Sequence, residues 1–353
     1  MTEPWYATRE DVMRALDVKL TARSTRQIDR ALQSASRDID SLCHRRFYPE
    51  TATRSFDWPG SQYRPSWRLW LDDQELISLT SITSGGTAIS PDDVVLYPLS
   101  GAPYSRVETN LGTSAAWGGG DTHQADVTIT GLWGYRLDET TVGALAADVA
   151  STTATTITVN GPASAELGVG SILRIDDERM IVTGRSMVDT GQGFGDSMTA
   201  AKNDVSIGAA DGTAYAVDEV ILRDSERMLI VDIAGNTLTV ERAWDGSVLA
   251  AHTDSAIYAP RALTVVRGAL GTTATTHDSA ASVRRWNPPG LVRDLTIAEA
   301  LNRVTNEQAG YARTRRTSGG GASTDQALTA RDLPALREQV YNAHGRKARH
   351  RGV

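Results

Sequence analysis

Apolar positions recur at helical spacing near both ends of the chain and at strand spacing between them. Ser24 and Gln27 have the spacing of an N-terminal capping pair, and from there apolar residues follow a period of about 3.6 residues up to Cys43. Thr8 and Asp11 have the same capping spacing. These signals predict a helical hairpin near the N-terminus.

Short segments with alternating or β-branched apolar residues come next, separated by turn-forming glycines. They predict short antiparallel strands at 67–71, 77–83, 94–97 and 127–132. After Pro288 and Pro289 a helical apolar face returns. A glycine-rich linker at 317–323 then precedes a last helix, which we expect to be introduced by Asp332 and Pro334. A helix on such a linker is typical of a partner-binding arm.

The central part of the chain repeats itself. Glu178-Arg179-Met180 recurs as Glu226-Arg227-Met228, and the same offset without gaps aligns Ile157 with Val205. A second duplication places Leu238-Thr239-Val240, Arg242, Gly246 and His252 opposite Leu263-Thr264-Val265, Arg267, Gly271 and His277. Repeated strand and turn units favour a small barrel or sandwich in which each copy supplies the missing hydrophobic face of the other.

Composition and charge narrow the function classes. The 353 residues are 40% hydrophobic and carry a net charge of −7, which argues against a dedicated duplex-DNA binder. A lone cysteine, Cys43, excludes an intramolecular disulfide and a cysteine-built zinc site. Residues 1–17 lack the apolar run of a signal peptide, and no segment has the length of a membrane span. We expect a soluble protein made in the cytoplasm, with no membrane contact.

Positive charge gathers toward the C-terminus, before and after the glycine-rich linker. A solvated tail and a docking tail for an acidic partner are both compatible with this pattern. The residues concerned are the arginines Arg313, Arg315 and Arg316, and the terminal group Arg346, Lys347, Arg349 and Arg351.

Each candidate for catalysis or ligand binding has a simpler structural interpretation. Adjacent Cys43 and His44 point in different directions at a helix end, so packing is favoured over a nucleophile with its base. His252 and His277 occupy equivalent repeat positions, which favours turn-stabilising hydrogen bonds over metal ligation. We therefore predict no enzyme activity, no cofactor and no bound metal.

Three further motifs are assigned in the same way. Asp176-Asp177-Glu178 has an incomplete copy, Asp224-Ser225-Glu226, and lacks the glycine of a calcium loop, so a solvated hairpin is favoured. The glycine-rich stretch 191–196 has no helix after it, so a mobile loop is favoured over a phosphate loop. Trp58, Trp67, Trp70, Trp117 and Trp133 could form a sugar-binding platform, but core and interface burial explain them better.

Several segments, in order, resemble the head-to-tail adaptor (connector) proteins of tailed bacteriophages. They are Ala7-Thr8-Arg9-Glu10-Asp11-Val12, the helix end at Arg46-Phe47-Tyr48, Leu69-Trp70-Leu71, the stretch 94–104 with Gly101-Ala102-Pro103-Tyr104, and Gly131-Leu132-Trp133-Gly134-Tyr135. The resemblance covers roughly residues 7–135 and 287–311. It implies a helical adaptor module with a short antiparallel β segment. The insert departs from the family, because a minimal adaptor lacks it. With the insert we expect an α+β fold, in which the module carries an inserted all-β domain, a barrel or sandwich, with an internal duplication.

On this basis we divide the chain into five parts. They are a helical hairpin (1–50), the β segment of the adaptor module (51–139), the inserted duplicated β domain (140–285), the helix that completes the module (286–316), and a flexible linker with a basic C-terminal docking arm (317–353). We expect the insert on the outer wall of a ring, because a large domain in the lumen would block DNA.

The resemblance implies a structural virion protein located at the phage neck. It implies a homo-oligomeric ring, usually of twelve copies, beneath the portal protein, with the genome passing through the lumen without tight binding. Loops of the β segment would face the next neck or tail protein, a stopper or tail terminator. A C-terminal segment would grip the portal, and the arm residues assigned to this role are Arg313, Arg315, Arg316, Leu336, Val340, Tyr341, Arg346, Lys347, Arg349 and Arg351.

The alternative is a virion protein that binds a receptor or glycan through the β insert, with the helices as an anchor. Exposed aromatic residues on the insert would favour it. The insert has few of them, namely Phe194, Tyr215, Trp244, Tyr258 and Trp286. A hydrolase would need carboxylates that converge in a cleft, and nothing in their spacing indicates one.

Overall fold

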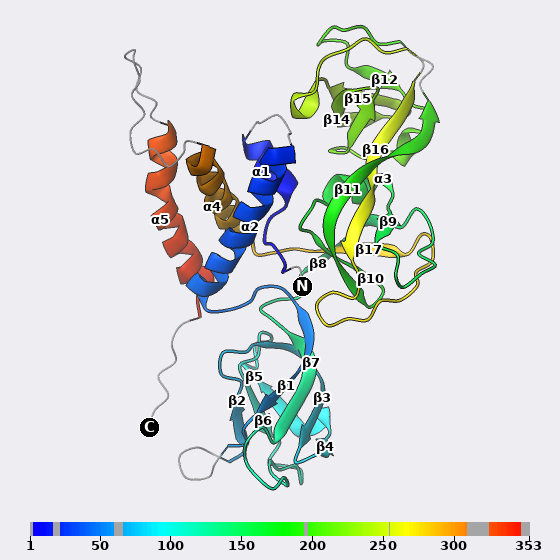
Figure 1. Cartoon of the computed structure of the whole chain (residues 1–353). Coiled ribbons are helices and arrows are strands. Elements are labelled where there is room, and N and C mark those ends of the chain that lie inside the picture. The colour runs from blue at the N-terminus through cyan, green and yellow to red at the C-terminus, as the bar shows by residue number, and fades with distance from the viewer. Residues whose placement is uncertain are drawn as a thin grey trace. The chain divides into compact units, whose positions relative to one another are not determined.

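Figure 1 shows the chain as a computed structural model that describes residues 3–16, 22–59, 66–193, 197–253, 255–308 and 325–346. The chain forms two compact units, Met1–Arg37 with Glu139–Ala335, and Asp38–Asp138 with Leu336–Val353. Strands account for 36% of the structure and helices for 24%. The predicted helical module with a short β segment is therefore wrong, because antiparallel sheets dominate. No helix in the described ranges is long and apolar enough to cross a bilayer.

Helices α1, α2 and α4 contribute to one apolar cluster in the first unit. The α-helices are α1 (Arg9–Leu16), α2 (Ala22–Cys43), α3 (Gly161–Glu166), α4 (Gly290–Gln308) and α5 (Asp325–His344). Val12 of α1, Leu32 of α2 and Val304 of α4 are at most 1% exposed. The predicted Thr8–Asp11 capping pair is confirmed: the Thr8 N–H donates to Asp11 Oδ2 (2.9 Å) and the Asp11 N–H to Thr8 Oγ1 (3.1 Å). The helix start predicted from Ser24 and Gln27 is wrong, because α2 begins at Ala22. Helix α5 begins before the predicted start and contains Pro334.

Two antiparallel sheets make up most of the second unit. One has the strand order β1-β7-β3-β4 and the other β2-β6-β5. Their strands are β1 (Glu50–Phe56), β2 (Arg68–Trp70), β3 (Leu76–Ser84), β4 (Thr87–Ile89), β5 (Val94–Tyr97), β6 (Arg106–Thr109) and β7 (Val127–Trp133), with a 3-10 turn η1 (Pro91–Asp93) before β5. Leu71, Ile82, Ile129 and Trp133 are at most 1% exposed in the shared core. Burial of Trp133 confirms the packing interpretation for this tryptophan.

The insert is a single ten-stranded sheet that opens with β8 (Glu139–Ala144) and closes with β17 (Ser282–Trp286). Its strand order is β12-β15-β14-β13-β16-β11-β10-β17-β8, with β9 paired to β16. The remaining elements are β9 (Thr156–Thr158), β10 (Ile172–Ile175), β11 (Glu178–Gly193), β12 (Ser206–Gly208), η2 (Gly212–Ala214), β13 (Val220–Arg223), β14 (Glu226–Ala234), β15 (Thr237–Glu241), η3 (Trp244–Gly246) and β16 (Ala256–Val266).

The duplication is nested, with one copy inserted in the other. Strands β14 and β15 form a hairpin closed at Gly235, and β11 and β16 form the equivalent hairpin of the other copy. The copy that contains β14 and β15 follows β11 in the sequence and ends in the first residues of β16. We call it the inner copy (197–259). We call the surrounding copy, residues 142–188 and 260–286, the outer copy. Both hairpins have the same register and a bulge at the same step, Ile230 to Asp232 and Val182 to Gly184.

Two details of the predicted duplication are wrong. Ile157 pairs with Leu263, and the residue that pairs with the equivalent Leu238 is Ile207. The ungapped alignment of Ile157 with Val205 is therefore two residues out of register. Each copy also has its own buried core, with Met180 in the outer and Met228 in the inner copy. The copies do not complete each other's hydrophobic face, because each hairpin folds over its own apolar side chains.

The N-terminal segment docks on a loop of the outer copy. The Arg9 N–H donates to Val169 O (3.0 Å), and the Val169 N–H donates to Glu10 Oε2 (2.8 Å). Gly170, which has a φ of +101°, lies under the Trp5 ring, where a Cβ would come within 2.5 Å of that ring. Trp5 and Glu10 therefore fix the insert to α1 within the first unit.

Candidate functional site

Each repeat copy has a group of buried polar side chains next to one of its strand turns. In the inner copy, Asp224 (φ +51°) turns the chain from β13 into Glu226, the first residue of β14. In the outer copy, Asp176 (φ +50°) turns the chain from β10 into Glu178, the first residue of β11. Both glutamates are at most 1% exposed. Each copy therefore places a carboxylate in its interior and needs groups that compensate it.

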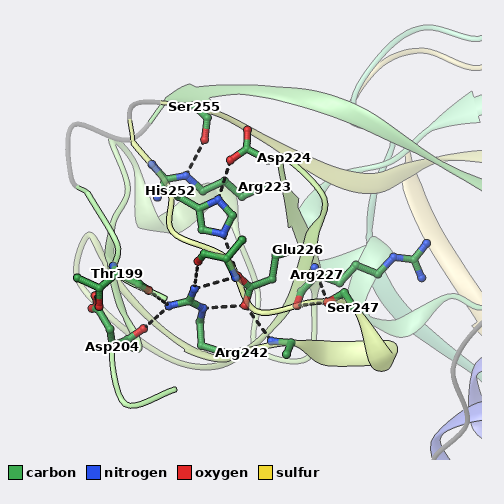
Figure 2. A network of polar contacts seen from close by, with 12 residues as sticks. Thr199, Asp204, Arg223, Asp224, Glu226, Arg227, Arg242, Ser247, His252 and Ser255 are labelled. Atoms are coloured by element: carbon green, nitrogen blue, oxygen red, sulfur yellow. Dashed lines mark hydrogen bonds and ion pairs between the residues drawn. The ribbon is translucent and has the colours of Figure 1, made fainter. Parts of the chain in front are cut away.

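Figure 2 shows how the inner copy compensates this charge. Arg242 donates from Nε to Glu226 Oε1 (2.8 Å) and from Nη2 to Glu226 Oε2 (2.9 Å). The backbone N–H groups of Ala243 and Ala250 each donate to Glu226 at 2.9 Å. His252 Nε2 lies 2.9 Å from Glu226 Oε2, and its Nδ1 lies 2.6 Å from Asp224 Oδ2. The side chains of Glu226, Arg242 and His252 are fully buried.

The outer copy builds the same network from Glu178. Arg267 donates from Nε and Nη2 to the two carboxylate oxygens, both at 2.8 Å. The N–H groups of Gly268 (2.8 Å) and Thr275 (3.0 Å) donate to the same carboxylate. His277 lies between Glu178 (2.9 Å) and Asp176 (2.8 Å). We call these two sets, Asp224–Glu226–Arg242–His252 and Asp176–Glu178–Arg267–His277, the carboxylate networks.

The networks hold loops in place and offer little for acid–base chemistry. Burial by itself raises the pKa of Glu178 and Glu226, but bonds from arginine, backbone N–H groups and histidine outweigh it and lower both pKa values to about 2. A carboxylate with this pKa is a poor proton acceptor near neutral pH. Its oxygens are also occupied by five donor groups. Each glutamate therefore fastens the loop that follows its paired arginine onto the start of the hairpin.

The histidines were expected to make turn-stabilising hydrogen bonds, and the structure places them in the networks. Both ring nitrogens of His252 and His277 lie next to carboxylate oxygens. The described residues contain no group of three or more His, Cys, Asp or Glu arranged to hold a metal ion. The sequence carried a signal for the networks, because Glu178 and Arg267 each recur in a duplication. It did not show that the glutamate of one duplication pairs with the arginine of the other.

Two cavities lie elsewhere, one in each unit. The first, of about 260 Å³, is lined by groups that include Trp5, Glu10, Arg185 and Trp244. Burial raises the pKa of Glu10, against the opposing effects of Arg185 and the Val169 N–H. The second, of about 620 Å³, is lined by mixed charges that include Arg54.

The predicted docking arm falls partly outside the described residues. This applies to Arg313, Arg315, Arg316, Lys347, Arg349 and Arg351. Of the others, Val340 is fully buried, Leu336 is half-buried and Tyr341 is 37% exposed. The Arg346 N–H donates to Cys43 O (2.9 Å). Val340 is thus a packing residue, and portal docking by the arm stays a prediction.

The other sequence candidates lie apart from the networks. Cys43 is buried, and burial raises the pKa of its thiol to about 11. The opposing effect of Arg45 is smaller. The thiol is therefore a weak nucleophile. His44 is exposed with a φ of +53°. The predicted mobile loop at 191–196 is wrong for Gly191–Gly193, which belong to β11, and residues 194–196 lie outside the described ranges.

Taken together, the fold and the networks define a mostly β protein stabilised by duplicated buried ion networks. Comparison with protein families, with curated proteins and with solved structures found no match to this chain.

Proposed function

We propose that the chain is a structural virion protein that forms a ring at the head-to-tail junction of a tailed phage, beneath the portal. The observation that carries the proposal is the cluster shared by Val12, Leu32 and Val304. Helices on either side of the long insert pack together there, so the insert does not separate them, and they lie in the segments that resemble phage adaptor proteins.

The charge distribution supports the same role. Residues 309–353 contain nine Lys and Arg against three Asp and Glu, whereas residues 1–308 contain 27 against 40. A body of net charge −13 suits a channel through which DNA slides, because strong phosphate neutralisation would hold the genome in place. The basic C-terminal part, of net charge +6, suits an acidic docking surface on the portal. The next neck or tail protein would face the loops of the second unit.

The chemistry of the networks also fits a structural role. Their buried carboxylates have pKa values of about 2 and are saturated with donors. They stabilise loops instead of exchanging protons at neutral pH. This favours a mechanical part of a virion over a hydrolase.

The test is mass photometry with negative-stain imaging of the purified chain, alone and mixed with the portal protein of the same phage. We expect rings of about twelve 37.9 kDa copies, about 455 kDa, formed alone or on the portal. A chain that stays monomeric and does not bind the portal would refute the proposal.

Receptor or glycan binding through the insert is less well supported. Tyr215 and Trp286 are buried at 4% and 5% exposure, so they serve packing. Trp244 is half-buried, and Tyr258 is 38% exposed. Phe194 lies outside the described residues. A sugar platform would need several exposed rings on one face.

A further inference from the structure

The outer face of the sheet β2-β6-β5 in the second unit is rich in arginine and aromatic side chains. Leu69, Val107 and Val94 point into the core, with exposures of 3%, 0% and 9%. Side chains alternate along a strand, so their neighbours lie on the opposite face. The side chains of the opposite, outer face form what we call the arginine platform: Arg68, Trp70, Tyr97, Arg106 and Glu108.

The platform is held in one arrangement by contacts across the strands. Trp70 and Tyr97 are both paired with Arg106, whose guanidinium carbon lies 5.0 Å from the Trp70 ring centre and 4.3 Å from that of Tyr97. Arg68 Nε (2.7 Å) and Arg106 Nε (2.8 Å) both contact Glu108 Oε1. One carboxylate thus faces two arginines, and these three groups carry a net charge of +1.

The composition of the platform favours a protein partner. Trp, Tyr and Arg are the residues that most often dominate the energy of protein interfaces. Arg106 covers one face of Trp70 and of Tyr97, which leaves each ring at most one face for stacking a sugar. Duplex DNA needs a concentrated positive surface, and here Glu108 neutralises part of the charge. The Arg68 side chain is 33% exposed and the Arg106 side chain is 20% exposed, so both can reach a partner.

Charge complementarity selects the partner. Residues 1–308 of this chain have a net charge of −13, and loops of the second unit expose Asp57, Asp92 and Asp121. In a ring of identical copies each subunit offers two different surfaces to its neighbours. We propose that the arginine platform binds a carboxylate-bearing loop of a neighbouring copy of this chain. The inference deepens the proposed ring by naming one of its contacts.

The experiment compares self-assembly of the full chain with that of Arg68→Glu and Trp70→Ala by mass photometry over a concentration series. Both residues are half-buried on the outer face of the sheet, and thermal melts confirm that each variant folds. We expect each to raise the concentration for half-assembly at least about tenfold. Arg136→Glu, at a side chain that is 69% exposed in the same unit, is the matched charge reversal and leaves assembly unchanged. Asp57→Arg, Asp92→Arg and Asp121→Arg are each combined with Arg68→Glu. The combination that reverses the charge of the contacting loop should restore assembly.

The outcomes separate this inference from the proposed function. If the unmodified chain assembles and both platform variants assemble equally well, the platform contact is wrong while the ring stands. If the unmodified chain never self-associates, the contact between copies is also wrong, and portal binding alone then decides the proposed function. If Arg68→Glu fails to fold, Trp70→Ala gives the result.

Discussion

Arg242→Met is the sharpest test of the carboxylate networks. Methionine keeps an unbranched side chain but cannot donate to Glu226, which stays buried without its charged partner. Breaking a buried ion pair on one side costs about 3–5 kcal/mol. Burial by itself raises the pKa of Glu226, and Arg242 is the largest of the groups that lower this pKa to about 2, which agrees with the cost in direction. We expect the inner copy to lose roughly 3 kcal/mol.

Hydrogen–deuterium exchange measures this loss locally. In Arg242→Met the amides of Ala243 and Ala250, which donate to Glu226, should exchange on the order of a hundredfold faster. The outer copy is an internal control, because Gly268 and Thr275 donate to Glu178. Arg267→Met should produce the reverse pattern. If Arg242→Met changes stability by less than about 1 kcal/mol, or both loops respond equally to either variant, the networks do not fasten the loops as argued.

Three further predictions address acid stability, docking and thiol reactivity. The two network glutamates have folded pKa values of about 2, below the ordinary 4.5, so their stabilisation is present above about pH 4.5 and is lost as the pH falls toward 2. Hydrogen–deuterium exchange at pH 6, 4 and 3 should therefore show that the insert loosens as the pH falls. Unchanged protection of its amides would contradict this. Gly168→Ala should cost about 1–3 kcal/mol in thermal or chemical unfolding, because the new methyl group meets Glu10, and an unchanged stability would contradict the docking of the N-terminal segment on this loop. Cys43, buried with a pKa of about 11, should react with a thiol reagent at pH 8 only after denaturation, and rapid labelling of the folded chain would show that its burial is wrong.

The sequence predicted local structure where one periodic face was buried. The helical stripe of α2 and the strands β3, β5 and β7 were found, because their apolar spacing directly reflects one buried side. Strands β1 and β6 were missed, since β1 (Glu50–Phe56) contains many polar residues and β6 (Arg106–Thr109) carries charges on its outer face. The predicted fold class was wrong because these strands pair with distant segments, which no local window shows.

The candidate site divides in the same way. The repeats showed that Glu178 and Arg267 each recur, as Glu226 and Arg242. Their roles became clear only from the tertiary structure. The inner copy separates Glu178 from Arg267 in the sequence, and folding brings the two together in a buried network. The sequence by itself therefore determined the helix faces, the capping pair and the existence of a duplication, because these depend on neighbouring residues. Tertiary structure decided which charges are buried and paired, because desolvation and ion pairing depend on contacts between distant parts of the chain.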